Sequence, residues 1–151
     1  EVLPGYSGGT LPNPSYEQVC SELTGHAEVV QLTFDASVIS FTDLLNVFFT
    51  IHDPTSLNQQ GADIGTRYRS SIFYHSESQR DIAEGVMSSL AEKDIWPKPL
   101  VTELAPVAPF YVAEDYHHHY YRRNTGLPYC QIVIAPKVAK LRSYYLTMLK
   151  A

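Results

Sequence analysis

A chain of 151 residues is long enough to form one domain with its own hydrophobic core, and 44% hydrophobic with 18% charged residues is typical of a globular protein. The net charge of -5 disfavours a nucleic-acid partner, and no apolar run is long enough to cross a membrane. Two cysteines do not make a disulfide framework, and no secretory signal opens the chain, so we expect a cytoplasmic protein.

The first predicted element is a loop, because prolines and glycines punctuate residues 1–19. A strand follows over residues 28–35, where apolar and polar residues alternate. Strand periodicity places Val30, Leu32 and Phe34 on one face of this strand. We expect that face to be buried.

A helix is predicted after this strand. Ser40 and Asp43 form a capping-box pattern, and apolar residues follow them at helical spacing. The helix ends near Asp53-Pro54, because the residue before a proline avoids helical geometry. Residues 55–69 are polar and contain glycine, which predicts a second loop, and residues 71–75 predict a short strand.

The second half of the chain contains two longer helices. Ser76 and Gln79 cap the first of them, whose apolar stripe runs to Leu90. Four more elements follow in chain order: a strand over about 100–104, a short helix over 114–122, an apolar strand over 130–135 and an amphipathic helix that begins at Pro136.

Strands and helices alternate along the chain, but the strands are few and the polar loops are long. The predicted fold class is therefore α+β, a two-layer sandwich of a small mixed sheet with packed helices. We expect residues 1–151 to form a single domain. The loops over 1–19 and 55–69 flank the predicted sheet and carry most of the polar residues, and long loops in a compact domain are usually functional.

Glu28 follows a Gly25-His26 turn, at the point where a loop becomes the predicted strand. A carboxyl group buried there is either paired or protonated, because a lone buried carboxylate is too costly. A protonated carboxyl group in a pocket is a proton donor. The alternative is a glutamate on an edge strand that faces solvent. The eleven tyrosines leave a similar choice between core aromatics and a pocket rimmed with phenol donors.

Four blocks of the sequence stand out together. They are Gly5-Tyr6-Ser7-Gly8-Gly9, the segment from Asn13 to Cys20 with Thr24-Gly25-His26-Ala27-Glu28, His52-Asp53-Pro54-Thr55 with the segment from Asn58 to Ser70, and Ala113-Glu114-Asp115-Tyr116-His117. With these blocks in this order and spacing, the chain resembles methionine sulfoxide reductase A, the peptide methionine-(S)-sulfoxide reductases.

The resemblance implies reduction of methionine-(S)-sulfoxide, free or in proteins, and a role for four residues. Glu28 matches the acid that protonates the departing oxygen, and burial would keep its proton at neutral pH. Tyr16 and Tyr68 match two hydroxyls that hold the sulfoxide oxygen, and Asp63 matches a carboxylate that positions a water. No metal and no organic cofactor are expected, because sulfur carries the redox chemistry.

The family's nucleophilic cysteine lies in a Gly-Cys-Phe-Trp segment that precedes the Gly5 block. We therefore expect the nucleophile, with its strand and helix, to lie upstream of Glu1, and the chain alone to be inactive. A second cysteine or an external thiol would then form a disulfide that thioredoxin reduces. A catalytically inactive module that binds methionine sulfoxide and a structural domain in a fusion remain as alternatives.

The two cysteines and the histidines allow weaker inferences. Cys20 is expected to be a small inert thiol, while Cys130 is either a resolving cysteine or a core thiol. The run from His117 to His119 lacks a complete ligand set, so we expect no metal site there. We expect His26 and His117 to stand behind the catalytic residues as hydrogen-bonding partners.

Overall fold

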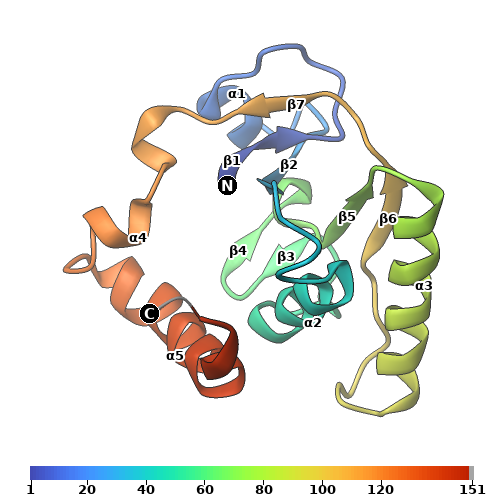
Figure 1. The fold of residues 1–151 in the computed structure, drawn as a ribbon. Helices are drawn as coiled ribbons and strands as arrows, with labels where there is room; N and C mark the ends of the chain where they lie inside the picture. The colour runs from blue at the N-terminus through green and yellow to red at the C-terminus, as the bar shows by residue number, and fades with distance from the viewer. Residues whose placement is uncertain (150–151) are drawn as a thin grey trace.

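The fold combines three short sheets with helices, and the sheets lie in different parts of the molecule (Figure 1). The computed structural model describes residues 1–149. The strands are β1 (Val2–Ser7), β2 (Ala27–Leu32), β3 (Gln59–Gln60), β4 (Asp63–Ile64), β5 (Ser71–Tyr74), β6 (Glu103–Pro106) and β7 (Phe110–Val112). The helices are α1 (Tyr16–Cys20), α2 (Phe41–Ile51), α3 (Glu77–Glu92), α4 (Tyr120–Arg123) and α5 (Ala135–Tyr145). A 3₁₀ turn, η1, spans Thr66–Tyr68, and further 3₁₀ turns span Asp115–His117 and Leu146–Met148.

The α+β class is confirmed, with parallel and antiparallel pairs in separate sheets. In the largest sheet, β1 lies between β2 and β7 and is antiparallel to both. Its register places Tyr6 opposite Glu28 on one side and Tyr111 on the other. β3 and β4 form an antiparallel hairpin, and β5 pairs with β6 in parallel.

The prediction of a loop over residues 1–19 was wrong, because the segment contains both β1 and α1. Pro4 and Gly5 are residues typical of turns, so the composition of β1 does not resemble that of a strand. The strand forms because it pairs with residues that are distant in sequence. Gly5 is needed for this pairing, since a Cβ atom there would lie 2.4 Å from the Tyr111 carbonyl oxygen. α1 begins with a reciprocal capping box between Ser15 and Gln18.

The predicted strand over 28–35 is present as β2, but its apolar face is not buried as predicted. Val30 is 59% exposed and Leu32 is 41% exposed. Both side chains are exposed because they point to a face of β2 that the described part of the chain leaves uncovered, and β2 is also an edge strand of its sheet. The alternative expectation, an edge strand that leaves Glu28 exposed, agrees better with the structure.

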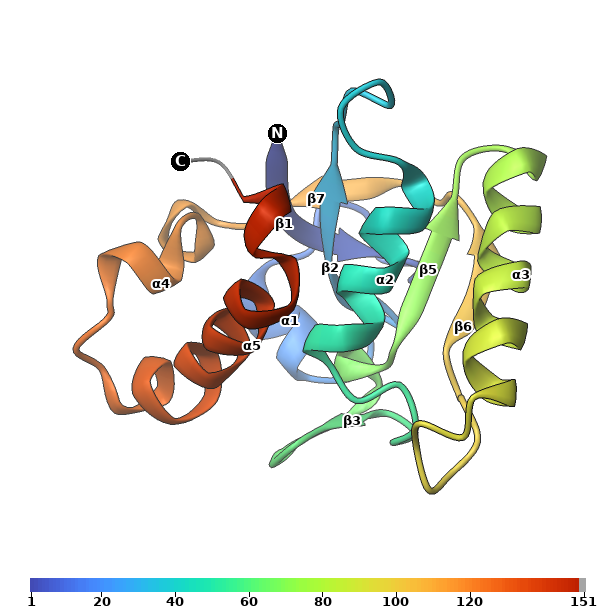
Figure 2. The ribbon, with the colours of Figure 1, turned by 60° about the horizontal axis from the view of Figure 1, so that its bottom comes forward.

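Both capped helices are confirmed, and they enclose the larger hydrophobic cluster. Ser40 and Asp43 form the predicted capping box of α2, and the Ser76 side chain accepts the Gln79 N–H at the start of α3. α2 packs between α3 and α5 (Figure 2). The cluster is built on Leu45, Phe49, Ile72 and Ala83, with Trp96 and Leu104 packed against it.

A second, smaller cluster lies under the largest sheet. Tyr6, Val19 and Ala113 are buried together there, with Tyr16 packed against them. These residues come from β1, from α1 and from the segment just after β7. The smaller cluster therefore supports the region that carries most of the residues predicted to be functional.

Three further predictions required correction. The apolar run Cys130–Ile134 forms a π-helix that leads into α5, not a strand, because its residues continue the helical hydrogen bonding. The helix predicted over 114–122 is divided into a 3₁₀ turn and α4, since His119 has a left-handed backbone with φ of 52°. The loop predicted over 55–69 holds β3, β4 and η1, whose few residues carry too little periodicity for prediction.

Candidate functional site

Four residues that the sequence predicted as catalytic lie within electrostatic reach of one another. Tyr16 comes from α1, Glu28 from β2, Asp63 from β4 and Tyr68 from the end of η1. The charge of Glu28 acts on both tyrosine hydroxyls, and the charge of Asp63 acts on Glu28 and Tyr68. These side chains are thus neighbours in the folded chain, although they are separated by up to 52 residues in sequence, and we call this group of residues the acid face.

Glu28 is exposed by surface area, yet nearby protein atoms shield its carboxyl group from part of the solvent. Desolvation raises the pKa of Glu28 above its ordinary value, and the neighbouring Asp63 and Glu22 act in the same direction. The Arg67 guanidinium opposes this rise. The net effect favours the protonated carboxyl group relative to a free glutamate.

Tyr16 is fixed at the first turn of α1 by a distant carboxylate. Glu114 accepts the Tyr16 backbone N–H at 3.1 Å, the Tyr116 hydroxyl at 2.9 Å and the Tyr6 hydroxyl at 3.5 Å. The Tyr16 hydroxyl has a raised pKa, mainly through its contact with the Cys20 thiol and then through burial. It therefore stays protonated and able to donate a hydrogen bond at neutral pH.

Asp63 and Tyr68 face a tyrosine that sequence reasoning missed. The Tyr129 hydroxyl donates to Asp63 Oδ2 at 3.4 Å. Burial and the Asp63 charge raise the pKa of Tyr129 to about 12. Burial also raises the pKa of Tyr68, against the opposing effect of Arg67. Tyr129 lies 66 residues from Asp63, and no local pattern marks it.

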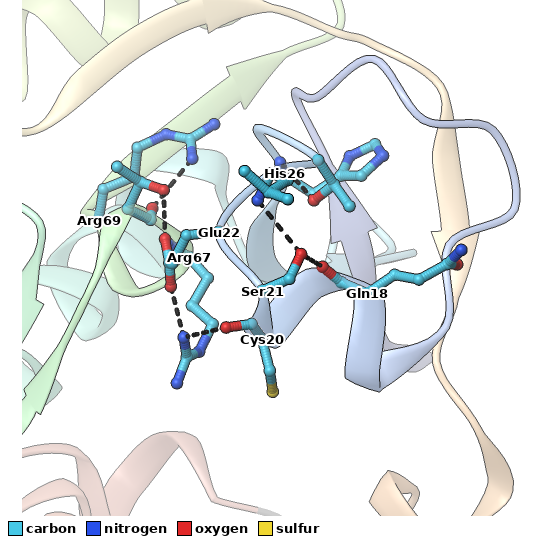
Figure 3. A network of polar contacts seen from close by, with 10 residues as sticks. Gln18, Cys20, Ser21, Glu22, His26, Arg67 and Arg69 are labelled. Atoms are coloured by element: carbon cyan, nitrogen blue, oxygen red, sulfur yellow. Dashed lines mark hydrogen bonds and ion pairs between the residues drawn. The ribbon is translucent and has the colours of Figure 1, made fainter.

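An ion pair between Glu22 and Arg67 lies beside the acid face (Figure 3). The Glu22 carboxylate also accepts the Thr66 hydroxyl at 2.5 Å and the Arg67 backbone N–H at 3.4 Å. Burial alone would raise the pKa of Glu22, but these hydrogen bonds outweigh it and hold the pKa below its usual range. The Arg67 guanidinium lies over the Tyr68 ring, 4.5 Å from the ring centroid.

His26 fastens the glycine-rich loop to the start of β2. The buried imidazole accepts the Gly9 backbone N–H at Nδ1, at 3.0 Å, and its Nε2 lies 2.7 Å from the Leu11 carbonyl oxygen. These partners require the neutral tautomer with the proton on Nε2. A Cβ atom at Gly9 would lie 2.3 Å from the Thr24 carbonyl oxygen, so the loop can approach β2 this closely only with glycine. His26 thus holds the chain in place two residues before Glu28.

His117 lies on the Tyr16 side of the acid face. Its ring centroid is 4.9 Å from that of Tyr16, and its Nε2 atom is 3.8 Å from Glu114 Oε2. Desolvation lowers the pKa of His117, although Glu114 opposes this effect. His117 therefore packs against the ring of Tyr16 and lies next to Glu114, whose carboxylate fixes the Tyr16 backbone.

The two cysteines differ in accessibility, and both are free thiols. Cys20 is partly exposed and lies at the end of α1, four residues after Tyr16. Cys130 has no exposed surface and opens the π-helix Cys130–Ile134, directly after Tyr129. An attack by the Cys130 thiol on another sulfur requires this helical turn to open.

Residues 1–149 show no sign of a metal site. Within that range no group of three or more histidine, cysteine or acidic side chains is arranged to hold a metal ion. No helix in the described range is both long and apolar enough to span a bilayer. Two surface hollows, of about 400 and 410 Å³, lie between α2 and α3 and beside the loop that contains Pro12, away from the acid face.

Comparison with known proteins decides the family. A family model described as peptide methionine sulfoxide reductase matches residues 1–148. The chain belongs to the peptide methionine sulfoxide reductase family. The predicted family and the predicted activity class, an oxidoreductase that reduces methionine sulfoxide, are thereby confirmed.

Two similar reductases show the extent of this match. The peptide methionine sulfoxide reductase MsrA of Deinococcus radiodurans is 54% identical over 145 residues, which cover 96% of this chain and 70% of the relative. The MsrA of Saccharolobus solfataricus is 57% identical over 144 residues, which cover 95% of this chain and 80% of the relative.

Solved reductase structures have the same fold. The crystal structure of reduced Mxr1 from Saccharomyces cerevisiae matches with a TM-score of 0.79 and 36% identity, over 85% of this chain and 74% of that chain. The methionine sulfoxide reductase A of Corynebacterium diphtheriae matches with a TM-score of 0.71 and 31% identity, over 83% and 64% of the two chains. The acid face thus belongs to a reductase fold.

Proposed function

We propose that the acid face binds the oxygen of methionine-(S)-sulfoxide and protonates it while a thiolate attacks the sulfur. Tyr16 and Tyr68 donate hydrogen bonds to the oxygen, Glu28 delivers the proton, and Asp63 orients a water beside it. The observation that carries this proposal is the placement of a partly desolvated Glu28 carboxyl group near the Tyr16 and Tyr68 hydroxyls, and this desolvation raises the pKa of Glu28. Such donors stabilise negative charge as it develops on oxygen.

The proposed reaction transfers oxygen from one sulfur to another. The thiolate forms a bond to the sulfoxide sulfur while Glu28 protonates the oxygen, the sulfur–oxygen bond breaks, and the oxygen leaves as hydroxide. Hydroxide then attacks the cysteine sulfur of this sulfonium adduct and breaks the new sulfur–sulfur bond, which releases methionine and leaves the cysteine as a sulfenic acid. A second thiol condenses with the sulfenic acid to give a disulfide and water, and an external dithiol then reduces the disulfide.

The thiols of this cycle are part of the proposal. The attacking cysteine belongs to the Gly-Cys-Phe-Trp segment that the family resemblance places ahead of Gly5. Thioredoxin or another thiol reductant regenerates it, as expected in a reducing compartment such as the cytoplasm. Cys130 is the candidate for the resolving thiol. Its position beside Tyr129 supports this assignment, and its complete burial requires the π-helix to open first.

Replacement of Glu28 by glutamine tests the proton donor. Glutamine keeps the volume and can still hydrogen-bond the oxygen, but it cannot deliver a proton. A positioned general acid contributes about 10²–10⁴-fold, so the single-turnover rate at neutral pH should fall by that factor in a reductase that carries the Gly-Cys-Phe-Trp segment together with this chain. Thermal stability should change little, because the Glu28 carboxyl group accepts no hydrogen bond from the residues the structure describes and the strand pairing of its backbone is kept.

A matched control separates proton donation from a loss of negative charge. Glu84→Gln removes an exposed carboxylate from α3, far from the acid face, and should leave the rate unchanged. Tyr68→Phe should cost less than Glu28→Gln, since the second phenol and the acid still hold the oxygen. An unchanged rate for Glu28→Gln, or a loss that tracks unfolding, would exclude Glu28 from the mechanism. Tight binding of the sulfoxide without turnover in the same reductase would instead favour a binding module.

A further inference from the structure

The charges of the chain are divided unevenly along its length. All 16 acidic residues lie within residues 1–115, whereas six of the 11 lysines and arginines lie within residues 116–151. A charge asymmetry of this size indicates an interaction with a negatively charged partner. The basic part is folded, because it contains α4, the π-helix Cys130–Ile134 and α5. We call residues 120–145 the basic arm.

The cations of the basic arm are exposed and lack acidic partners. Within residues 1–149, each ion pair of an arginine or a histidine joins residues outside this arm, so no carboxylate there neutralises it. Lys137 and Lys140 are about one helical turn apart on α5, so both project from the same side of the helix. The five exposed cations of the arm are Arg122, Arg123, Lys137, Lys140 and Arg142.

Exposed apolar side chains lie at the centre of the basic arm. Leu127 is 43% exposed, Tyr129 is 46% exposed and Ile132 is 74% exposed. Along the chain they lie between the arginines of α4 and the lysines of α5, and Figures 1 and 2 both show α4 next to the start of α5. An apolar centre with a charged rim is usual for a surface that binds a protein segment.

One hydrogen bond connects the basic arm to the acid face. The Tyr129 hydroxyl donates to Asp63 Oδ2 at 3.4 Å, so Tyr129 borders both regions. A protein segment that places an oxidised methionine at the acid face therefore passes close to Tyr129. Lys137 and Lys140 lie about 10–16 Å farther along the helix, from the rise of about 1.5 Å per residue. An extended chain advances about 3.3–3.6 Å per residue, so side chains roughly three to five positions from the methionine reach these lysines.

We propose that the basic arm selects protein substrates that carry acidic residues three to five positions from the methionine sulfoxide. This inference rests on the proposed function of the acid face. Leu127, Tyr129 and Ile132 contact the apolar part of the segment, and Lys137 and Lys140 attract its carboxylates. Acidic residues directly beside the oxidised methionine are not favoured, because they meet the carboxylate of Asp63. A long polyanion is disfavoured as well, because the acidic residues 1–115 repel it.

The test compares peptides in a reductase that carries the Gly-Cys-Phe-Trp segment together with this chain, with dithiothreitol as the reductant. One peptide has glutamates three to five residues from methionine sulfoxide on both sides, and two others have glutamines or lysines there. At low salt, kcat/KM should be about threefold to tenfold higher for the glutamate peptide than for the glutamine peptide, the effect of a few exposed ion pairs, and lowest for the lysine peptide. In 1 M salt, where the Debye length is about 3 Å, the preference should vanish. Glutamates moved next to the methionine sulfoxide should give no gain.

Charge reversal in α5 should reverse the preference. The double variant Lys137→Glu with Lys140→Glu should favour the lysine peptide over the glutamate peptide. Lys93→Glu with Lys98→Glu is the matched control, because it changes the net charge equally at exposed positions at and after the end of α3, and it should keep the preference for glutamate. Each rate is divided by the rate of the same variant on free methionine sulfoxide, so a general loss of activity cancels. The same preference in both double variants, or no preference in the unaltered reductase, would overturn the inference.

Two further measurements separate this inference from its alternatives. Glu28→Gln should slow all three peptides by the same factor, because it acts on the chemical step. An unchanged rate in that variant would contradict the proposed acid, while the ratio between peptides would still decide the role of the basic arm. If Lys137→Glu with Lys140→Glu slows turnover only when a protein dithiol replaces dithiothreitol, the basic arm binds the reductant and the inference is wrong.

Discussion

The carboxylate of Glu114 joins the smaller core to the acid face, and its removal has a calculable effect. Glutamine at this position keeps one side-chain oxygen, but an amide NH₂ group replaces the other oxygen, and this group cannot accept a hydrogen bond. Either the Tyr16 backbone N–H or the Tyr116 hydroxyl then loses its acceptor. A hydrogen bond to a charged group is worth about 1.5–3 kcal/mol when buried. Because the Glu114 side chain is 34% exposed, we reduce the expected loss for Glu114→Gln to about 1–2 kcal/mol.

Stability and activity should both report this change. Urea unfolding should give the loss in free energy, and the melting temperature should fall by about 2–8 °C. Glu17→Gln is the matched control, because Glu17 is an exposed acid in the first turn of the same helix. Its melting temperature should stay close to that of the original chain.

A double-mutant cycle checks that Glu114 acts through Tyr16. If Glu114 serves the reaction by fixing the first turn of α1, then Glu114→Gln should lower kcat/KM in a reductase that carries the Gly-Cys-Phe-Trp segment together with this chain. The same change should have little further effect once Tyr16→Phe has removed the hydroxyl. Losses that simply add in the double variant would refute this reasoning, because they would mean that Glu114 acts independently of Tyr16.

Two more predictions follow from buried groups elsewhere. Burial lowers the pKa of His52, whose Nε2 contacts the Ser70 hydroxyl at 2.7 Å. The unfolded state therefore binds a proton more readily, so the unfolding free energy should drop as pH falls through about 6.5 and below, and His52→Gln should flatten this dependence in urea titrations. Iodoacetamide should label Cys20 in the folded protein well before Cys130, whereas equal rates would show that the π-helix opens readily.

Local signals in the sequence were sufficient for some elements. The caps at Ser40 and Ser76 were predicted correctly, because a capping residue and its partner lie within one helical turn. β1 was missed for the opposite reason. Its strand geometry depends on pairing with residues 27–32 and 110–112, while Pro4 and Gly5 look locally like a turn. The apolar run from Cys130 was misread because a short run of this kind fits a strand or a buried helix equally well.

The site shows the same division between local and distant information. Glu28 stood out from its own neighbours in sequence, since a carboxyl group at the start of a strand is unusual. The residues that support the site did not. Glu22 meets Arg67 across 45 residues, Glu114 meets Tyr16 across 98, and Tyr129 meets Asp63 across 66. Such contacts exist only after the chain has folded, so single-sequence patterns carry no trace of them.

The division of the hydrophobic interior into two clusters has a consequence for how the protein responds to heat. The acid face rests on the smaller cluster of Tyr6, Val19 and Ala113, while most of the buried apolar surface lies around Leu45 and Phe49. Regions with fewer buried contacts open first in the native state, and amide protons there exchange sooner. Warming should therefore open the acid face before the helices around Leu45 and Phe49, so that hydrogen exchange there speeds up while the circular dichroism of the protein still looks native.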